Sequence, residues 1–203
     1  MYILSIDLGT SGPKVALVSE TGDLAASATR AVHTHILSPC GAEQDANAIW
    51  AAVLDAATQV LHEAATPRDA VVGISCASQY FSVVPVDRNL QPLMNLIVWM
   101  DGRGGPYSRK LYEHHTSAFA TWVDIHGMMP LPSGNDSLSH MLFVQYECPR
   151  VYERTYKFLE PMDFIIAKLT GTCTSNVCTA FPMLLTDNRD LASGDYDPRL
   201  LSM

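Results

Sequence analysis

The chain of 203 residues has little charge and lacks any long hydrophobic run. Charged residues make up 17% of it, and no stretch approaches the roughly 18 consecutive apolar residues that cross a bilayer. Its 13 Lys and Arg residues are scattered, so no basic run could neutralise successive nucleic-acid phosphates. The first residues, MYILSIDLGTS, lack the basic region of a signal peptide. We therefore expect a cytoplasmic protein with neither membrane nor nucleic acid as partner.

Metal and redox motifs are also missing. The sequence has no C-x-x-C pair among its five cysteines and no H-E-x-x-H among its seven histidines, which gives a transition-metal site little support. We expect reduced, mostly buried thiols.

What the chain does contain is enough apolar material for a core. Hydrophobic residues make up 48%, the net charge is −8, and the length suits one large domain at about 150 residues per domain. With neither an internal repeat nor a linker in view, we predict one domain over residues 1–203.

The first half of the chain predicts a mixed α/β sheet. Apolar runs at 2–6 and 14–18 flank a turn, and a third, edge-like strand covers 24–35, so the opening reads as a three-stranded antiparallel meander. Asp45 can cap a helix with apolar positions from 49 to 61. The fully apolar run 70–77 is typical of a strand covered on both faces.

The second half predicts shorter elements. We expect strands at 82–86 and 96–99, irregular structure over 102–135 with a helix near 107–115, and a helix around 138–145 that Pro149 ends. A strand at 157–159 then leads into a helix from Pro161 to Leu169, which Gly171 terminates.

The segment DLGTSG, followed by a lysine, is the clearest candidate for chemistry. Its glycines let backbone amides approach an anion, and its hydroxyls add hydrogen-bond donors. A carboxylate at the end of a strand can hold hydrated Mg²⁺, and the lysine supplies a positive charge to the same phosphates. The residues with these roles are Asp7, Gly9, Thr10, Ser11, Gly12 and Lys14. On spacing alone, an ordinary hairpin turn with a capping Asp is an equal interpretation.

This segment resembles the first phosphate loop of the actin, hexokinase and Hsp70-like ATPases, and its D-L-G-T-S-G-x-K-V form resembles the FGGY carbohydrate kinases, xylulose kinases in particular. Further ordered matches extend over essentially the whole chain. They are Glu43-Gln44-Asp45 with Trp50, Trp99-Met100-Asp101-Gly102-Arg103, Pro161-Met162-Asp163 with Thr170-Gly171, and Gly194-Asp195-Tyr196-Asp197 with Leu200-Leu201.

The resemblance implies a ribonuclease H-like, actin-like domain that uses ATP and Mg²⁺. It places Asp7 at the metal, and Asp101 and Arg103 at the sugar side of the cleft, although from the residues alone a surface pair is the favoured interpretation. Gln79, Tyr80 and Phe81 align with the family's Q-M-H segment, with Phe81 in place of a His that could bond a hydroxyl. Core aromatics are a comparable interpretation of Tyr80 and Phe81.

The implied activity is ATP-dependent phosphorylation of a sugar or polyol hydroxyl, with a pentulose such as xylulose favoured. The resemblance implies a second actin-like domain that carries the general base, so we expect a truncated, N-terminal domain that is inactive alone. A homodimer is one expected assembly. The alternatives are a non-catalytic sugar-binding or regulatory module and another ATPase of the superfamily, against which the W-x-D-G-R match argues.

Overall fold

The computed structural model describes the backbone of residues 1–203 and every side chain except that of Arg68. The strands are β1 (Tyr2–Gly9), β2 (Gly12–Ser19), β3 (Leu24–Thr29), β4 (His35–Leu37), β5 (Gly41–Gln44), β6 (Val71–Ser78), β7 (Val84–Val86), β8 (Leu96–Ile97) and β9 (Lys157–Leu159). The α-helices are α1 (Ala46–Glu63), α2 (Gly105–His114), α3 (Ala118–Ile125), α4 (Ser137–Glu147), α5 (Pro149–Arg154), α6 (Pro161–Thr170), α7 (Val177–Ala180) and α8 (Pro198–Leu201). Short 3₁₀ turns lie at Arg68–Ala70 and Phe181–Met183.

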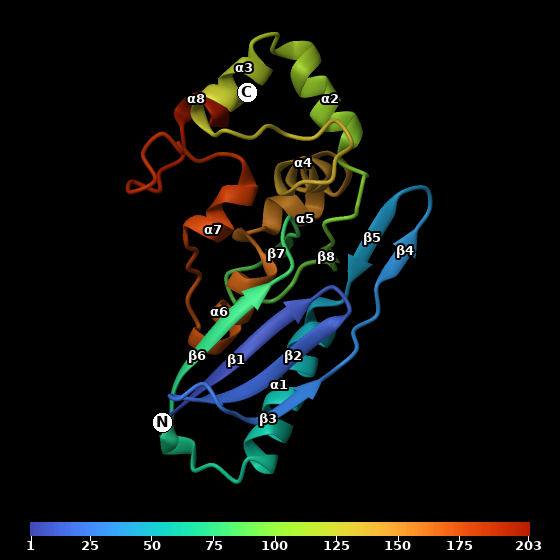
Figure 1. The fold of residues 1–203 in the computed structure, drawn as a ribbon. Helices are drawn as coiled ribbons and strands as arrows, with labels where there is room; N and C mark the ends of the chain where they lie inside the picture. Colours follow the sequence, from blue (N-terminus) through green and yellow to red (C-terminus); the bar gives the residue numbers. More distant parts are fainter.

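A four-stranded sheet in the order β3-β2-β1-β6 forms one end of the molecule (Figure 1). The β1–β2 and β2–β3 pairs are antiparallel, whereas β6 runs parallel to β1. The meander and the mixed sheet predicted from the sequence are therefore confirmed.

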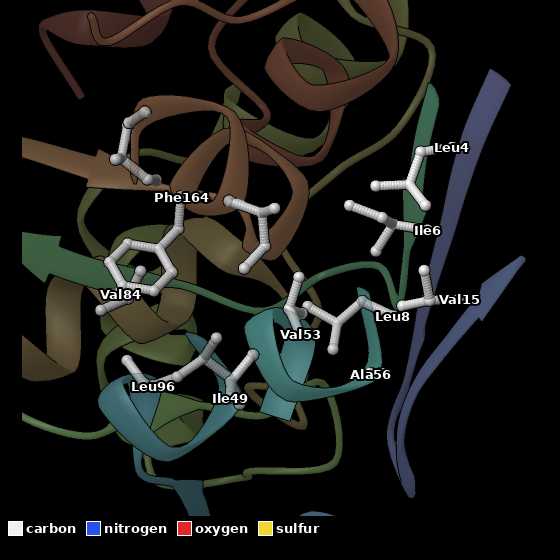
Figure 2. Close-up of a cluster of buried hydrophobic side chains, with 14 of the residues drawn as sticks. Leu4, Ile6, Leu8, Val15, Ile49, Val53, Ala56, Val84, Leu96 and Phe164 are labelled. Atoms are coloured by element: carbon white, nitrogen blue, oxygen red, sulfur yellow. The ribbon is translucent and has the colours of Figure 1, made fainter. Parts of the chain in front are cut away.

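Alternating apolar residues fix which face of this sheet is buried. Leu4, Ile6 and Leu8 of β1 are buried in one apolar core, to which α1 contributes Ile49 and Val53 (Figure 2). Burying each such aliphatic side chain stabilises the fold by about 1.5–3 kcal/mol. Helix α1 begins where expected, because Oδ1 of Asp45 accepts hydrogen bonds from the amides of Asn47 and Ala48.

Two small sheets connect this layer to the helical end of the molecule. One has the order β4-β5-β8 and the other pairs β7 with β9. Helix α6 packs against β6 and contributes Phe164 to the same core. It ends as predicted, at Gly171 with φ +74°. Helices α2, α3 and α8 lie at the opposite end from β1–β3 (Figure 1).

Several expected elements differ in the structure. The third strand ends at Thr29, and His35 instead belongs to β4, which pairs with β5. Strand β6 is not covered on both faces: it lies at the sheet edge, with Val72 57% and Ile74 50% exposed. The prediction of two covered faces was wrong because hydrophobic content does not reveal a strand's place in the sheet.

Four helices, α3, α5, α7 and α8, were not predicted from the pattern. Helix α3 lies in the segment expected to be irregular, and α5 begins at Pro149, in the first-turn position, directly after α4 ends. The cysteines are free, as expected, but Cys40 and Cys178 are exposed and the other three are half-buried. Across the described residues, no helix has the length and apolar character needed to cross a membrane.

Candidate functional site

The hairpin between β1 and β2 forms the predicted phosphate turn. Gly9 pairs with Gly12, so Thr10 and Ser11 alone make the loop. Gly12 has φ +127°, and a Cβ on it would lie 2.1 Å from the carbonyl oxygen of Arg30, so the position requires glycine. The Ser11 carbonyl accepts from Val32, whereas the amides of Thr10 and Ser11 make no hydrogen bond among the described residues. These two amides are donors that an anion can use.

The parallel pairing of β1 with β6 brings a second turn beside the first. Leu8 lies opposite Ser78, so both strands end at the same edge of the sheet. The amide of Gln79 donates to the carbonyl of Leu8 at 2.7 Å. Carboxyl ends of parallel strands are where α/β proteins commonly bind ligands. The segment 79–81 therefore faces the same space as the phosphate turn.

A hydrogen-bond network joins the two turns. The Thr10 hydroxyl donates to Oε1 of Gln79 at 3.0 Å and accepts from Nε1 of Trp99 at 3.0 Å. Nε2 of Gln79 donates to Gln44, which is buried and itself donates to the Thr10 carbonyl at 2.6 Å. Because the Thr10 hydroxyl proton is directed to Gln79, Thr10 can offer a phosphate only its backbone amide.

These residues line an open cavity of about 470 Å³. Six of the site residues predicted from the sequence are brought together there, with Ser78 and Trp99 completing the wall. The predicted ones are Asp7, Gly9, Thr10, Gln79, Tyr80 and Phe81. Tyr80 and Trp99 are 39% and 45% exposed, so both rings present apolar surface to a ligand. Tyr80 also offers its hydroxyl, whereas Nε1 of Trp99 is already bonded to Thr10. Ser11 and Lys14 adjoin this wall without lining it.

Burial raises the pKa of Tyr80 to about 12, and the nearby Glu160 carboxylate adds to the shift. The phenol is therefore a hydrogen-bond donor throughout the physiological range. Phe81 lies next to it, with the two rings edge-to-face at a centroid distance of 4.8 Å.

Asp7 stands at the mouth of the phosphate turn. It is paired across the hairpin with Lys14, whose Nζ lies 3.4 Å from Oδ2, and both side chains are more than half exposed. The described residues contain no group of three or more metal-ligating side chains. A single accessible carboxylate nevertheless fits Mg²⁺, which proteins commonly hold through one or two carboxylates together with substrate phosphates and water.

Asp101 and Arg103 are not brought to this cavity. Asp101 is fully buried, and its carboxylate accepts from the amides of Ala42 at 2.7 Å and Arg103 at 2.9 Å. The Arg103 guanidinium bridges Asp101 and Glu43 at 2.7 and 2.6 Å and stacks over Phe143. In the structure, this pair ties the segment after β8 to β5, and its polar groups are occupied by protein partners.

Comparison with known proteins identifies the family. The sequence profile of the "FGGY family of carbohydrate kinases, N-terminal domain" matches residues 2–203. The chain belongs to this family.

Its relatives are sugar and polyol kinases. A xylulose kinase of Klebsiella pneumoniae is 31% identical over 202 residues, which is 100% of this chain and 39% of the relative. A gluconokinase of Bacillus licheniformis is 29% identical over 94% of this chain and 36% of its own length. The chain thus spans about two fifths of the length of these relatives.

Solved structures share the fold. Ligand-bound xylulose kinase from Lactobacillus acidophilus superposes with a TM-score of 0.85 at 21% identity, covering 99% of this chain and 39% of that one. Plasmodium falciparum glycerol kinase with ADP superposes with a TM-score of 0.83 at 21% identity, covering 99% of this chain and 40% of that one. The predicted family and the actin-like, ribonuclease H-like fold class are confirmed.

The sequence interpretation missed two residues that adjoin the site. Trp99 was noted only as part of a motif, although an indole next to a strand end signals a residue able to contact both a ring and a polar group. Glu160 follows β9 and is buried at 1% exposure. Its only sequence signal was a carboxylate between the apolar strand and Pro161.

Proposed function

We propose that this chain is the N-terminal, sugar- and phosphate-contacting domain of an ATP-dependent carbohydrate kinase. The supporting observation is that Thr10, whose amide makes no hydrogen bond among the described residues, lines one cavity together with Tyr80, Phe81 and Trp99. A nucleotide phosphate and a sugar bound there would be neighbours, which phosphoryl transfer requires.

Each group has a defined task in this proposal. The amides of Thr10 and Ser11 bind phosphate oxygens, and Lys14 adds positive charge beside them. Asp7 holds Mg²⁺ directly or through water, and the metal, when bound, offsets charge on the phosphates. In the reaction, a sugar hydroxyl oxygen bonds to the γ-phosphorus, the bond from that phosphorus to the bridging oxygen breaks, and ADP leaves.

The proton of the attacking hydroxyl needs a base. Asp7 is the single carboxylate among the described residues that line the cavity, and it is assigned to the metal. We therefore place the base outside this chain and propose that the 203 residues alone do not turn over. Gln79 and Tyr80 can bond sugar hydroxyls, whereas the Phe81 ring offers an apolar face that suits the C–H side of a sugar.

A pentulose such as xylulose is our favoured substrate, because a xylulose kinase is among the relatives that match over the whole chain. Asp101 and Arg103 would contact the sugar only after leaving their present partners, so we propose for them the role of supporting the Trp99 segment. Cytoplasmic location and a homodimer remain predictions.

A non-catalytic sugar-binding module is the second candidate, favoured by Phe81 standing where a hydrogen-bonding His is expected. The test is ADP release by the complete product of the gene, with xylulose, other pentuloses, gluconate and glycerol. Sugar-dependent release above the no-sugar control supports the kinase. Saturable sugar binding by calorimetry without ADP release supports the module. If the protein shows neither sugar binding nor ADP release, both candidate functions are refuted. Light scattering on the same sample tests the dimer.

A further inference from the structure

Glu160 is a buried carboxylate that the proposed reaction does not use. It lies between β9 and α6 and is 1% exposed. In the part of the chain that the structure describes, its carboxylate bonds to the Ser137 hydroxyl at 2.8 Å and does not cap the first amides of α6. An acidic group is rarely kept inside a protein unless it has partners there, so its neighbours indicate its task.

Those neighbours belong to the end of the turn formed by residues 79–82, which we call the sugar-side turn. Val84 pairs with Leu159 in the antiparallel β7–β9 ladder, so Glu160, one residue further along, lies beside Ser82 and Val83. Burial raises the pKa of Glu160 to about 8, and the hydrogen bond from the Ser137 hydroxyl opposes this rise. The register of the ladder thus places Glu160 next to the residue that follows Phe81.

The turn that ends at Ser82 needs such support. Phe81 has φ +57°, a left-handed conformation that a residue with a bulky side chain seldom adopts unless its surroundings impose it. Ser82 is fully buried, and its hydroxyl accepts from the Trp99 amide at 3.0 Å. At the other end, the Gln79 amide is held by Leu8. Phe81 therefore lies between two anchored residues.

We propose that Glu160 is a positioning residue for the sugar side of the site, which holds Ser82 and thereby fixes Tyr80 and Phe81 in the orientation that receives the sugar. That the ligand is a sugar rests on the proposed function, but the anchoring of the turn is a property of the ligand-free chain. Glu160 acts from behind the cavity wall, through Ser82, and does not touch the ligand.

The variants are Glu160→Ala, Glu160→Gln and Asp163→Ala in the complete product of the gene. Glutamine can still accept the hydrogen bond from the Ser137 hydroxyl, so it should rescue what alanine loses. Asp163 is the matched control, because it is a second buried carboxylate, 2% exposed, that lies within α6 and lines a separate cavity with Cys173 and Thr179.

The first measurement is hydrogen–deuterium exchange without ligand. Glu160→Ala should speed exchange at residues 79–82 about tenfold, since the hydrogen bond from Ser137 and the packing of the buried Glu160 side chain are lost. Glu160→Gln and Asp163→Ala should leave these residues within about threefold of the wild type. Exchange that stays unchanged in Glu160→Ala, or that rises equally across the domain, would overturn the proposal.

The second measurement is steady-state kinetics. Glu160→Ala should raise the sugar KM about tenfold, equivalent to about 1.4 kcal/mol, with kcat and the ATP KM changed less than about threefold. Equal changes in both KM values, the same sugar KM effect from Asp163→Ala, or no rescue by glutamine would refute a positioning role.

The two measurements separate this inference from the proposed function. If the wild type phosphorylates none of the sugars, the proposed function fails, while the exchange experiment still decides whether Glu160 anchors the turn. If Glu160→Ala does not fold, Ser137→Ala replaces it, because it removes one hydrogen bond from the carboxylate. Faster exchange at 79–82 in Ser137→Ala supports the anchor, and wild-type exchange there contradicts it.

Discussion

Replacing Gly12 with alanine should unfold the phosphate turn or the whole sheet, whereas the same change at Gly9 should spare stability. At Gly12 the added Cβ would lie 2.1 Å from the Arg30 carbonyl oxygen, a distance that real Cβ atoms essentially never show. At Gly9 the nearest atom would be 3.7 Å away, an ordinary contact.

The size of the effect follows from two contributions. Holding a residue that has a side chain at φ +127° costs about 1–3 kcal/mol of backbone strain. Relief of the overlap requires moving backbone held by the Arg30–Pro13 and Val32–Ser11 hydrogen bonds, each 3.0 Å long. Losing both costs about 1–3 kcal/mol more. The sum, about 2–6 kcal/mol, is a large part of the 5–15 kcal/mol that typically stabilises a domain.

Urea unfolding followed by circular dichroism measures this difference. With a slope of about 2–3 kcal/mol per molar urea, Gly12→Ala should lower the midpoint by about 0.7–3 M. Gly9→Ala should stay within about 0.3 M and instead weaken ATP binding, since its methyl group would stand at the phosphate side of the turn. Equal midpoints for the two variants would refute the argument that backbone contact at Gly12 fixes the turn.

Three further predictions concern the site and its buried carboxyls. Asp7→Asn should lower turnover of the complete gene product by several orders of magnitude, because the metal loses its charged ligand, while the sugar Kd measured by calorimetry stays the same; an equal loss of sugar affinity would contradict the assignment. Trp99→Phe removes the indole bond to Thr10 and should raise the ATP KM about 2- to 10-fold, the equivalent of one hydrogen bond, and an unchanged KM would show that Thr10 is held without it. Stability should fall as the pH rises from about 4 to about 8, because burial raises the pKa of Glu160 to about 8 and of Asp163 to about 6. Both groups bind protons more tightly in the folded chain, so their stabilisation is complete below the unfolded pKa values and is lost as the pH passes the folded ones. Urea midpoints across this range should flatten in Glu160→Gln, and parallel curves for the variant and the wild type would oppose this account.

The parts of the fold that the sequence predicts are those set by near neighbours. The β1–β2 hairpin joins residues that are close in the chain, and its glycines, alternation and strand ends are visible in the sequence. Helices α1 and α6 carry their own start and stop signals at Asp45 and Gly171. Their boundaries could therefore be predicted without knowledge of the rest of the molecule.

Features that depend on distant partners could not be predicted from local patterns. Trp99 meets Thr10 across a separation of 89 residues, and Arg103 meets Glu43 across 60. An Asp and an Arg two residues apart look equally suited to a sugar or to an internal ion pair. Only the pairing of β5 with β8 shows that Glu43 lies within reach of Arg103.

The meeting of the two turns is a consequence of a single strand pairing. Leu4, Ile6 and Leu8 must face α1, and because side chains alternate along a strand, this fixes Asp7 on the opposite face of β1. Slipping β6 by one residue along β1 would exchange the faces of its side chains and shift Gln79 away from Leu8. The apolar core thus holds the phosphate turn and the sugar-side turn in register, so core substitutions far from the cavity should change ligand binding as well as stability.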